Sequence, residues 1–197
     1  MSAHSEFGKL KSLFIKKASA AFIDDAHIAQ HWESLNYLGK PVIEKALAEY
    51  EAFEQILKEN GTELLYLPSD DTVNMDSIYC RDAAIATNRG MIICNMGKEG
   101  RRNEPAAEHR AFEANGIPVL GFITAPGTLE GGDVAWLDEK TLAVGHTYRT
   151  NEEGIRQLAG LLAPLGVTVL PVSMPHYKGP SDVFHLMSVL SLSLIHI

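Results

Sequence analysis

Two stretches of this chain repeat one order of secondary-structure patterns, and that repetition limits its fold more than any other feature. In each stretch two short apolar runs joined by a polar turn precede an amphipathic segment, and a further apolar run follows. Such runs are typical of strands, and apolar residues three and four apart are typical of helices. The expected ranges are 83–87, 91–95, 105–115 and 118–123 in the first stretch, and 134–137, 141–144, 151–162 and 167–172 in the second.

A β-β-α-β unit of roughly 50 residues predicts an α/β protein whose modules pack around an axis. A doubly wound sheet is the alternative, because one sequence does not fix strand pairing. Before the repeats, we expect a strand at 10–16, a loop at 18–21, a helix at 41–60 and a strand at 62–67. No linker or low-complexity stretch divides the chain, so we expect one incomplete domain over residues 1–191.

The last six residues, 192–197, read Leu-Ser-Leu-Ile-His-Ile. The codons CTG TCT CTT ATA CAC ATC encode this hexapeptide, and that string is a common transposon-end sequencing adapter. A translated adapter is kept out of fold reasoning. We therefore expect residues 192–197 to be such a scar, with a short apolar strand as the alternative.

Composition restricts the classes of partner. The chain is 46% hydrophobic and 21% charged, as globular proteins are, and its formal charge is −8. That charge argues against nucleic acid, which requires clustered Lys and Arg, and it suits a cationic or zwitterionic small ligand. No apolar run approaches the roughly 20 residues that span a bilayer, and residues 1–8 lack a signal-peptide pattern. We expect a cytoplasmic protein with no membrane segment.

The two cysteines, Cys80 and Cys94, are too few for a disulfide framework, which fits a reducing compartment. Arg81 would favour a thiolate at Cys80, but Asp82 is equally near and opposes it. We therefore interpret both cysteines as small packing residues of strands.

Two acids, Asp76 and Asp82, bracket the entrance to the strand expected at 83–87. Acids mounted there can hold a cation, since binding groups concentrate on loops carried by a rigid sheet. The structural alternative is that Asp76 caps a turn and Asp82 pairs with Arg81 or Arg89.

A second acidic pair, Glu130 and Asp133, flanks Gly131 and Gly132. Paired glycines permit a close approach to a ligand, and the two acids would face one point. A glycine-bearing turn is the alternative, and it explains the glycines but not the acids.

Two arginines and a histidine are the remaining candidates for residues of a functional site. Arg149 ends a strand and opens a helix that Thr150 or Asn151 caps, so it can grip a carboxylate through two parallel hydrogen bonds. A solvated surface arginine is the commoner outcome, and the same holds for Arg101. His185 lies in an apolar expected strand, either as a satisfied core histidine or as a general acid/base.

Four motifs together resemble the guanidino-group-modifying superfamily, which includes dimethylarginine dimethylaminohydrolases, arginine deiminases and glycine amidinotransferases. The resemblance runs from about residue 12 to residue 188 and is closest to bacterial dimethylarginine dimethylaminohydrolase-like proteins. It implies a pentein-type α/β propeller with a central substrate channel, of which this chain holds about three and a half of five modules. The motifs, in the family's order, are 76–82 (DSIYCRD), 127–134 (GTLEGGDV), 148–151 (YRTN) and 184–188 (FHLMS).

The resemblance also implies roles by motif position. Asp82 would hold the substrate guanidinium, and Glu130 would orient His185 as general acid/base. The nucleophile of this superfamily is a cysteine near the C-terminus, which we expect this chain to lack, so we expect the chain as given to be inactive. No metal or organic cofactor is implied. The implied substrate-binding residues are Asp76 at the α-amino group, Arg101 and Arg149 at the carboxylate, and Asp82 and Asp133.

The implied reaction is hydrolysis of a guanidino carbon–nitrogen bond through a covalent thiouronium intermediate, which releases a ureido product such as citrulline plus an amine or ammonia. The substrate stays open between arginine and a methylated arginine. Arg81 stands where the well-known dimethylarginine enzymes have a second acid, and Met187 stands where arginine deiminases have an aspartate. A homodimer is compatible with this reading.

Three other classes remain open. An amidinotransferase uses the same intermediate, and a noncatalytic propeller could bind a partner instead. A metal hydrolase would use Asp82, Glu130, Asp133 and His185, but no HxxxH or comparable ligand spacing links these residues.

Overall fold

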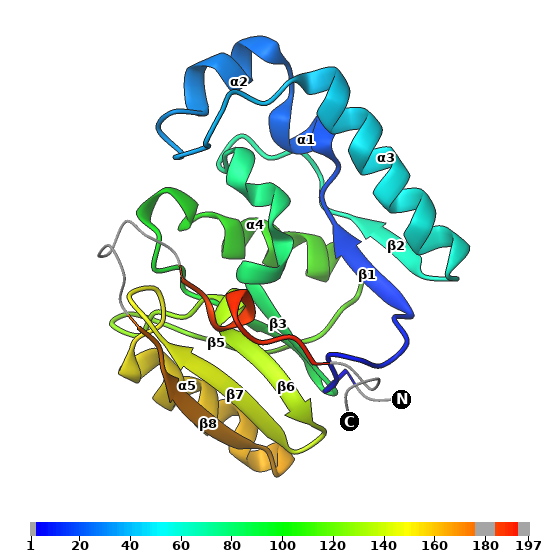
Figure 1. Ribbon diagram of the computed structural model, residues 1–197. Helices are drawn as coiled ribbons and strands as arrows, with labels where there is room; N and C mark the ends of the chain where they lie inside the picture. Colours follow the sequence, from blue (N-terminus) through cyan, green and yellow to red (C-terminus); the bar gives the residue numbers. More distant parts are fainter. Residues whose placement is uncertain (1–2, 176–183, 193–197) are drawn as a thin grey trace. The chain divides into compact units, whose positions relative to one another are not determined.

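The computed structural model of the protein describes residues 3–175 and 184–192 (Figure 1). The expected adapter lies outside these residues, apart from position 192. The chain divides into two compact units, which we call the N-terminal unit (Lys9–Cys80) and the main unit (Met1–Gly8 with Arg81–Ile197). Among the described residues, no helix combines the length and the apolar character needed to cross a membrane.

The N-terminal unit combines a two-stranded parallel sheet with three helices. Strand β1 (Ser12–Ile15) pairs with β2 (Glu63–Tyr66), and the helices are α1 (Ala18–Phe22), α2 (Asp25–His31) and α3 (Ile43–Glu59). Gly61 follows α3 with a φ of 77°, so it supplies the left-handed residue that ends this helix. The buried core of the unit consists of Ala18, Phe22, Ile28 and Met75.

Helices α1 and α2 differ from what the sequence predicted. The prediction of a loop at 18–21 is wrong, because these residues belong to α1. Ala18, Ala21 and Phe22 form the buried face of this helix. Helix α2 begins after Asp24, whose carboxylate accepts a hydrogen bond of 2.7 Å from the His27 amide. An aspartate at the N-cap was a readable signal for this helix.

The main unit contains the β-β-α-β order twice, which confirms the α/β class. In each three-stranded sheet an antiparallel hairpin is followed by a helix and a strand parallel to the hairpin's second strand. No described sheet closes into a barrel, and the propeller and its module count stay predictions. The elements are β3 (Ala84–Thr87), β4 (Gly90–Ile93), α4 (Glu104–Ala114) and β5 (Val119–Phe122), then β6 (Val134–Asp138), β7 (Thr141–His146), α5 (Glu152–Leu162) and β8 (Thr168–Ser173).

Short 3-10 turns connect these elements and carry most of the predicted site. They are η1 (Met75–Ile78), η2 (Cys80–Asp82), η3 (Glu99–Arg101), η4 (Gly131–Asp133), η5 (Ala163–Leu165) and η6 (Leu186–Ser188). Cys80 therefore lies in η2 and not in a strand, contrary to its predicted role, whereas Cys94 follows β4 and is buried.

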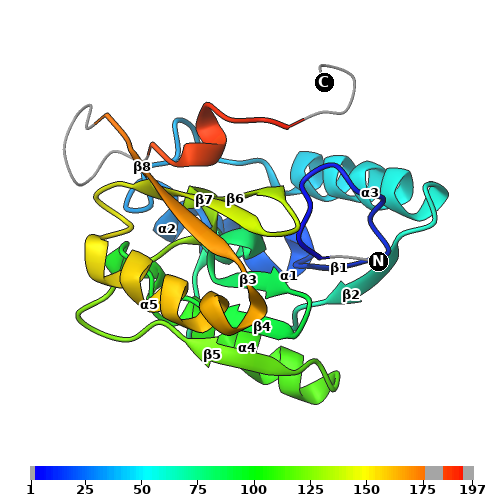
Figure 2. The same ribbon diagram turned by 90° about the horizontal axis from the view of Figure 1, so that it is seen from below.

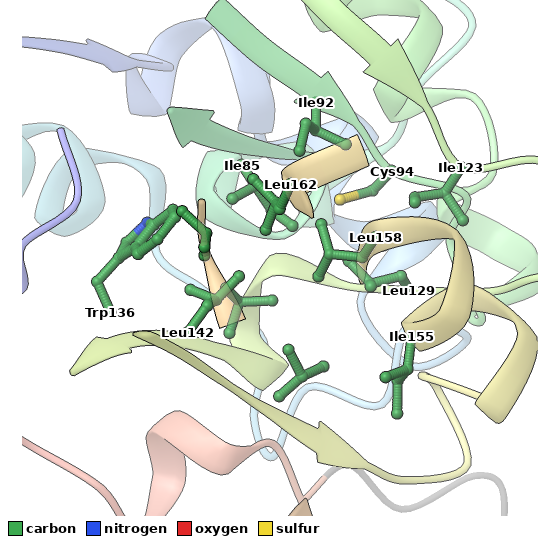
Figure 3. Close-up of a cluster of buried hydrophobic side chains, with 13 residues drawn as sticks. Ile85, Ile92, Cys94, Ile123, Leu129, Trp136, Leu142, Ile155, Leu158 and Leu162 are labelled. Atoms are coloured by element: carbon green, nitrogen blue, oxygen red, sulfur yellow. The ribbon is translucent and has the colours of Figure 1, made fainter. Parts of the chain in front are cut away.

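Helix α5 supplies the centre of the main core. It lies against β7 and β8 (Figure 2), and Leu158 and Leu162 are completely buried. Their side chains meet Ile85 and Ile92 from one sheet and Leu142 from the other (Figure 3). Burying a leucine contributes about 1.5–3 kcal/mol, so this cluster fixes both sheets of the unit and the turns at their ends.

Candidate active site

A carboxylate and an imidazole from distant segments form the centre of the site. His185 Nε2 lies 2.9 Å from Glu130 Oε2. Glu130 is completely buried, and 13% of the His185 side chain is exposed. The two residues stand 55 positions apart and come together because each precedes a 3-10 turn of the main unit.

The strand expected around His185 is wrong. His185 has extended backbone angles, but Leu186–Ser188 form η6, and the Ser188 amide donates to the His185 carbonyl at 2.9 Å. Leu186 is buried in a cluster with Ala135 and Ala143, so the apolar pattern reflects packing against β6 and β7 rather than pairing in a sheet.

Asp82 completes the centre. One ligand atom from each of Asp82, Glu130 and His185 lies within 4.8 Å of the other two. A Cβ at Gly132 would overlap His185 Nδ1 and stand 2.7 Å from Asp82 Oδ1. Only glycine allows both groups to come so close, which supports the ligand-approach interpretation of the paired glycines.

The charges of the pair favour its ionised form. Burial lowers the pKa of His185, but the hydrogen bond to Glu130 and the negative charges of Asp133 and Asp82 outweigh it and raise that pKa above 6.5. Burial raises the pKa of Glu130, but His185, Arg149 and the Lys98 amide outweigh it and lower that pKa below 4.5. The contacts within the pair therefore favour the imidazolium and the carboxylate over the neutral forms.

Arg101 already has carboxylate partners within the chain. Its Nε and Nη2 donate to the two Glu104 oxygens at 2.9 and 2.6 Å, and its Nη1 donates to Asp82 Oδ2 at 2.6 Å. All three side chains are mostly buried. To grip a substrate carboxylate, as predicted, Arg101 would have to share or exchange one of these bonds. The predicted pairing of Asp82 with Arg81 or Arg89 is wrong, because its ion-pair partner is Arg101.

Arg149 approaches the centre from the segment between β7 and α5. Its Nη1 lies 3.4 Å from Glu130 Oε1, which also accepts a 2.9 Å bond from the Lys98 amide. Asn151 caps α5 through a 2.8 Å bond from the Gly154 amide, as one of the two predicted caps. Arg149 is buried, so it is not the solvated arginine that was the alternative.

Both carboxylate oxygens of Asp133 accept hydrogen bonds from other residues of the chain. Its Oδ2 accepts bonds of 2.8 Å from Thr147 and 2.6 Å from Thr150, and its Oδ1 accepts a 3.1 Å bond from the Leu186 amide. The side chain is completely buried. Burial is the main reason that the pKa of Asp133 is raised.

Asp76 belongs to the other unit. It lies in η1, where Asn74 is the N-cap and accepts a 2.9 Å bond from the Asp76 amide. Asn74, and not Asp76, therefore caps this turn, and the predicted contact of Asp76 with a substrate stays a prediction.

Sequence reasoning missed the partners that hold the site together. Glu104, Thr147 and the Lys98 amide belong to none of the motifs, because they act through hydrogen bonds and ion pairs set by tertiary structure. A glutamate three residues after Arg101 was the one readable signal, since residues at that spacing face each other on a helix.

The central group also has the ligand types of a cation site. However, each Glu130 oxygen already accepts a hydrogen bond, from His185 and from Lys98, and the Arg149 guanidinium stands beside it. A metal ion would have to break the pair and lie near a fixed positive charge. The geometry therefore fits acid/base chemistry better than metal binding.

A family model described as "N,N dimethylarginine dimethylhydrolase, eukaryotic" matches residues 16–193. The chain belongs to this family. The N(G),N(G)-dimethylarginine dimethylaminohydrolase of Streptomyces coelicolor is 35% identical over 147 residues, which are 74% of this chain and 53% of that protein. The Pseudomonas aeruginosa enzyme of the same name is 32% identical over 133 residues, which are 68% of this chain and 52% of that protein. The chain thus spans about half the length of these curated relatives.

Solved structures agree with this family. The dimethylarginine dimethylaminohydrolase of Pseudomonas aeruginosa, as a cysteine-to-serine mutant complexed with citrulline, has a TM-score of 0.69 and 27% identity. The match covers 91% of this chain and 64% of that one. Arginine deiminases of Listeria also match in sequence, and an amidinotransferase shares the fold. The predicted superfamily of guanidino-modifying enzymes is confirmed.

Proposed function

We propose that this protein hydrolyses a carbon–nitrogen bond of a guanidino substrate, either arginine or a methylated arginine. The observation that carries the proposal is the His185–Glu130 pair at 2.9 Å beside Asp82, in a chain of the dimethylarginine dimethylaminohydrolase family. A relative of this fold is complexed with citrulline, which supports a ureido product.

In the first half of the proposed reaction, Asp82 and Glu130 hold the guanidinium and keep its carbon electrophilic. A cysteine thiolate attacks that carbon, so a C–S bond forms while a C=N electron pair moves to nitrogen. His185, as an imidazolium, gives its proton to the departing nitrogen, and the C–N bond breaks. An amine or ammonia leaves, and an S-linked thiouronium remains.

In the second half, neutral His185 takes a proton from water, and the resulting hydroxide attacks the same carbon. The C–S bond then breaks and restores the thiolate, the added hydroxyl loses its proton to solvent as the C=O bond forms, and the ureido product leaves. The raised pKa of His185 suits both halves, because the imidazolium is available as an acid and its conjugate base recovers the proton.

We propose that neither cysteine of this chain is the nucleophile. Cys94 is buried, and burial, followed by the charges of Glu108 and Asp82, raises its pKa well above the ordinary value, which disfavours a thiolate near neutral pH. The Cys80 sulfur donates to the backbone carbonyls of Ser77 and Ile78. We therefore expect the 197-residue chain alone to bind substrate without turnover, and we propose the reducing cytoplasm as its compartment.

For substrate recognition, we propose that Asp76 meets the α-amino group and that Arg101 and Arg149 meet the carboxylate. Arg149 is the easier of the two to redirect, because its contact with Glu130 is 3.4 Å long. Arg101 has three bonds of 2.9 Å or less to Asp82 and Glu104, so it would contribute mainly a fixed positive charge.

The proposal is tested by product analysis on the full-length protein that contains this chain. We expect arginine or dimethylarginine to yield citrulline, with ammonia or dimethylamine as the second product. His185→Ala should abolish nearly all turnover, and the control His146→Ala, at an exposed position of β7, should not. Ordinary activity in His185→Ala would contradict the assigned role. Amidino transfer to added glycine in place of citrulline would identify a transferase, and ligand binding with no product would identify a binding module.

A further inference from the structure

Asp133 accepts three hydrogen bonds, and the donors lie on two separate segments of the chain. Thr147 and Thr150 donate to one of its oxygens, and the Leu186 amide donates to the other. The side chain is 0% exposed. A buried carboxylate is stable only when its oxygens are well paired, and here three donors satisfy it.

The two threonine hydroxyls that bind Asp133 also accept hydrogen bonds from the backbone of other site residues. Thr150 Oγ1 accepts a 3.2 Å bond from the Glu130 amide. Thr147 Oγ1 accepts bonds of 3.0 and 3.1 Å from the amides of Arg149 and Thr150. One hydroxyl thus links Asp133 to the backbone of Glu130, and the other links it to the backbone of Arg149.

The third contact fixes the histidine. Leu186 follows His185 directly, and its amide is the first of η6. Anchoring that amide on Asp133 sets where the backbone turns after His185, and therefore where the imidazole meets Glu130. Glu130, Arg149 and His185 are thus each linked to Asp133 through one residue.

We infer that Asp133 is a positioning residue, which holds the segments of Glu130, Arg149 and His185 in register, rather than a contact for the substrate. The importance of this role for catalysis rests on the proposed function, but the role itself can be measured without turnover. A loss of register of about 1 Å at such a site can lower a rate by about 100-fold, so the role matters for catalysis.

An acceptor-only side chain of this length is required. Thr147 Oγ1 already accepts two amide hydrogen bonds, so it has only its own proton left to offer. An asparagine at position 133 has only one acceptor oxygen, which the two threonine hydroxyls would take, so its NH₂ group would face the Leu186 amide. A glutamate would not fit, because its extra methylene would push the carboxylate into Gly145. The space there is already so small that a Cβ on Gly145 would stand only 3.0 Å from Asp133 Oδ1.

The test is NMR spectroscopy of the labelled chain, so it needs no turnover. Asp133→Asn should accelerate hydrogen exchange of the Leu186 amide by at least about tenfold, the scale set by one hydrogen bond to a charged group. It should also shift the His185 titration midpoint downward. The matched control is Asp138→Asn, at the exposed end of β6, the strand that follows Asp133, where the carboxylate accepts from the Lys140 amide. We expect it to leave both readouts unchanged.

A second pair of variants covers the case in which Asp133→Asn does not fold. Thr150→Val keeps the Asp133 charge but removes the hydroxyl, and it should alter the His185 titration and ring tautomer, whereas Thr150→Ser should restore both. Unchanged readouts in Asp133→Asn, or in Thr150→Val if only that variant folds, would overturn the inference. Weaker arginine binding with unchanged readouts would restore the substrate-contact role. If the protein did not catalyse the proposed reaction, these spectra would not change. The positioning role of Asp133 and the proposed function can therefore be refuted independently.

Discussion

Substitution of Glu104 by glutamine tests how strongly the buried ion pairs hold the site. Glu104 binds the Arg101 guanidinium through two bonds, and both side chains are at most 5% exposed. Removing one partner of a buried ion pair costs about 3–5 kcal/mol, because a charge stays buried without full compensation. We expect about 3 kcal/mol, the lower end. Asp82 still accepts from Arg101 at 2.6 Å, and the amide keeps one acceptor oxygen.

The assay is urea unfolding in a Trp32→Phe background, so that Trp136 reports the main unit. With an m-value of about 2 kcal/mol per molar, a loss of 3 kcal/mol lowers the midpoint by about 1.5 M. The chain contains its own control. Glu153 binds Arg156 with the same two-bond geometry at 2.7 Å, but at the surface, so Glu153→Gln should leave the midpoint nearly unchanged. Equal effects of the two substitutions would refute the argument that burial makes the Arg101 pair strong.

Two further predictions concern the main unit. Because the pKa of His185 is raised on folding, its contribution to stability is present in full below pH 6.5 and is lost as the pH rises through the raised value. The stability difference between wild type and His185→Gln in urea titrations should therefore shrink above neutral pH, and a constant difference would contradict the pairing with Glu130. Leu158→Ala should lower the unfolding free energy by about 2–5 kcal/mol, because the side chain is completely buried, whereas Leu170→Ala, 42% exposed on β8, should change it far less.

The two hairpins and their helices could be predicted because their signals are local. Apolar runs and a helical repeat act within a few residues, and Gly116, with a φ of 67°, ends α4 in the same local way. The turns could not be placed to the residue. Asn88 and Arg89 form the first turn and Gly90 already pairs with Thr87, because register depends on the partner strand.

The site was predictable in its members but not in its contacts. Asp82, Glu130 and His185 were recognisable from motifs, and the structure brings them together. Their surroundings were not, since the pairing of Arg101 with Asp82 and the anchoring of Leu186 on Asp133 join segments 19 and 53 residues apart. Residue type gives the kind of bond a side chain can make, but only the tertiary fold decides which partner it receives.

Arg81 illustrates this rule best, because in the sequence it stands where the well-known dimethylarginine enzymes have a second acid. In the structure its Nη2 donates to the Val134 carbonyl at 3.0 Å and to Glu6 Oε1 at 3.1 Å. That Glu6 oxygen also accepts a 3.0 Å bond from the Trp136 amide.

Strand β6 is an edge strand of its sheet, so these two side chains satisfy backbone groups that would otherwise be open to another chain. Arg81 is thus turned to the sheet edge with a partner 75 residues away. Its positive charge is neutralised there by Glu6, so the departure from the family pattern reflects an edge-covering ion pair rather than a cation added to the substrate site.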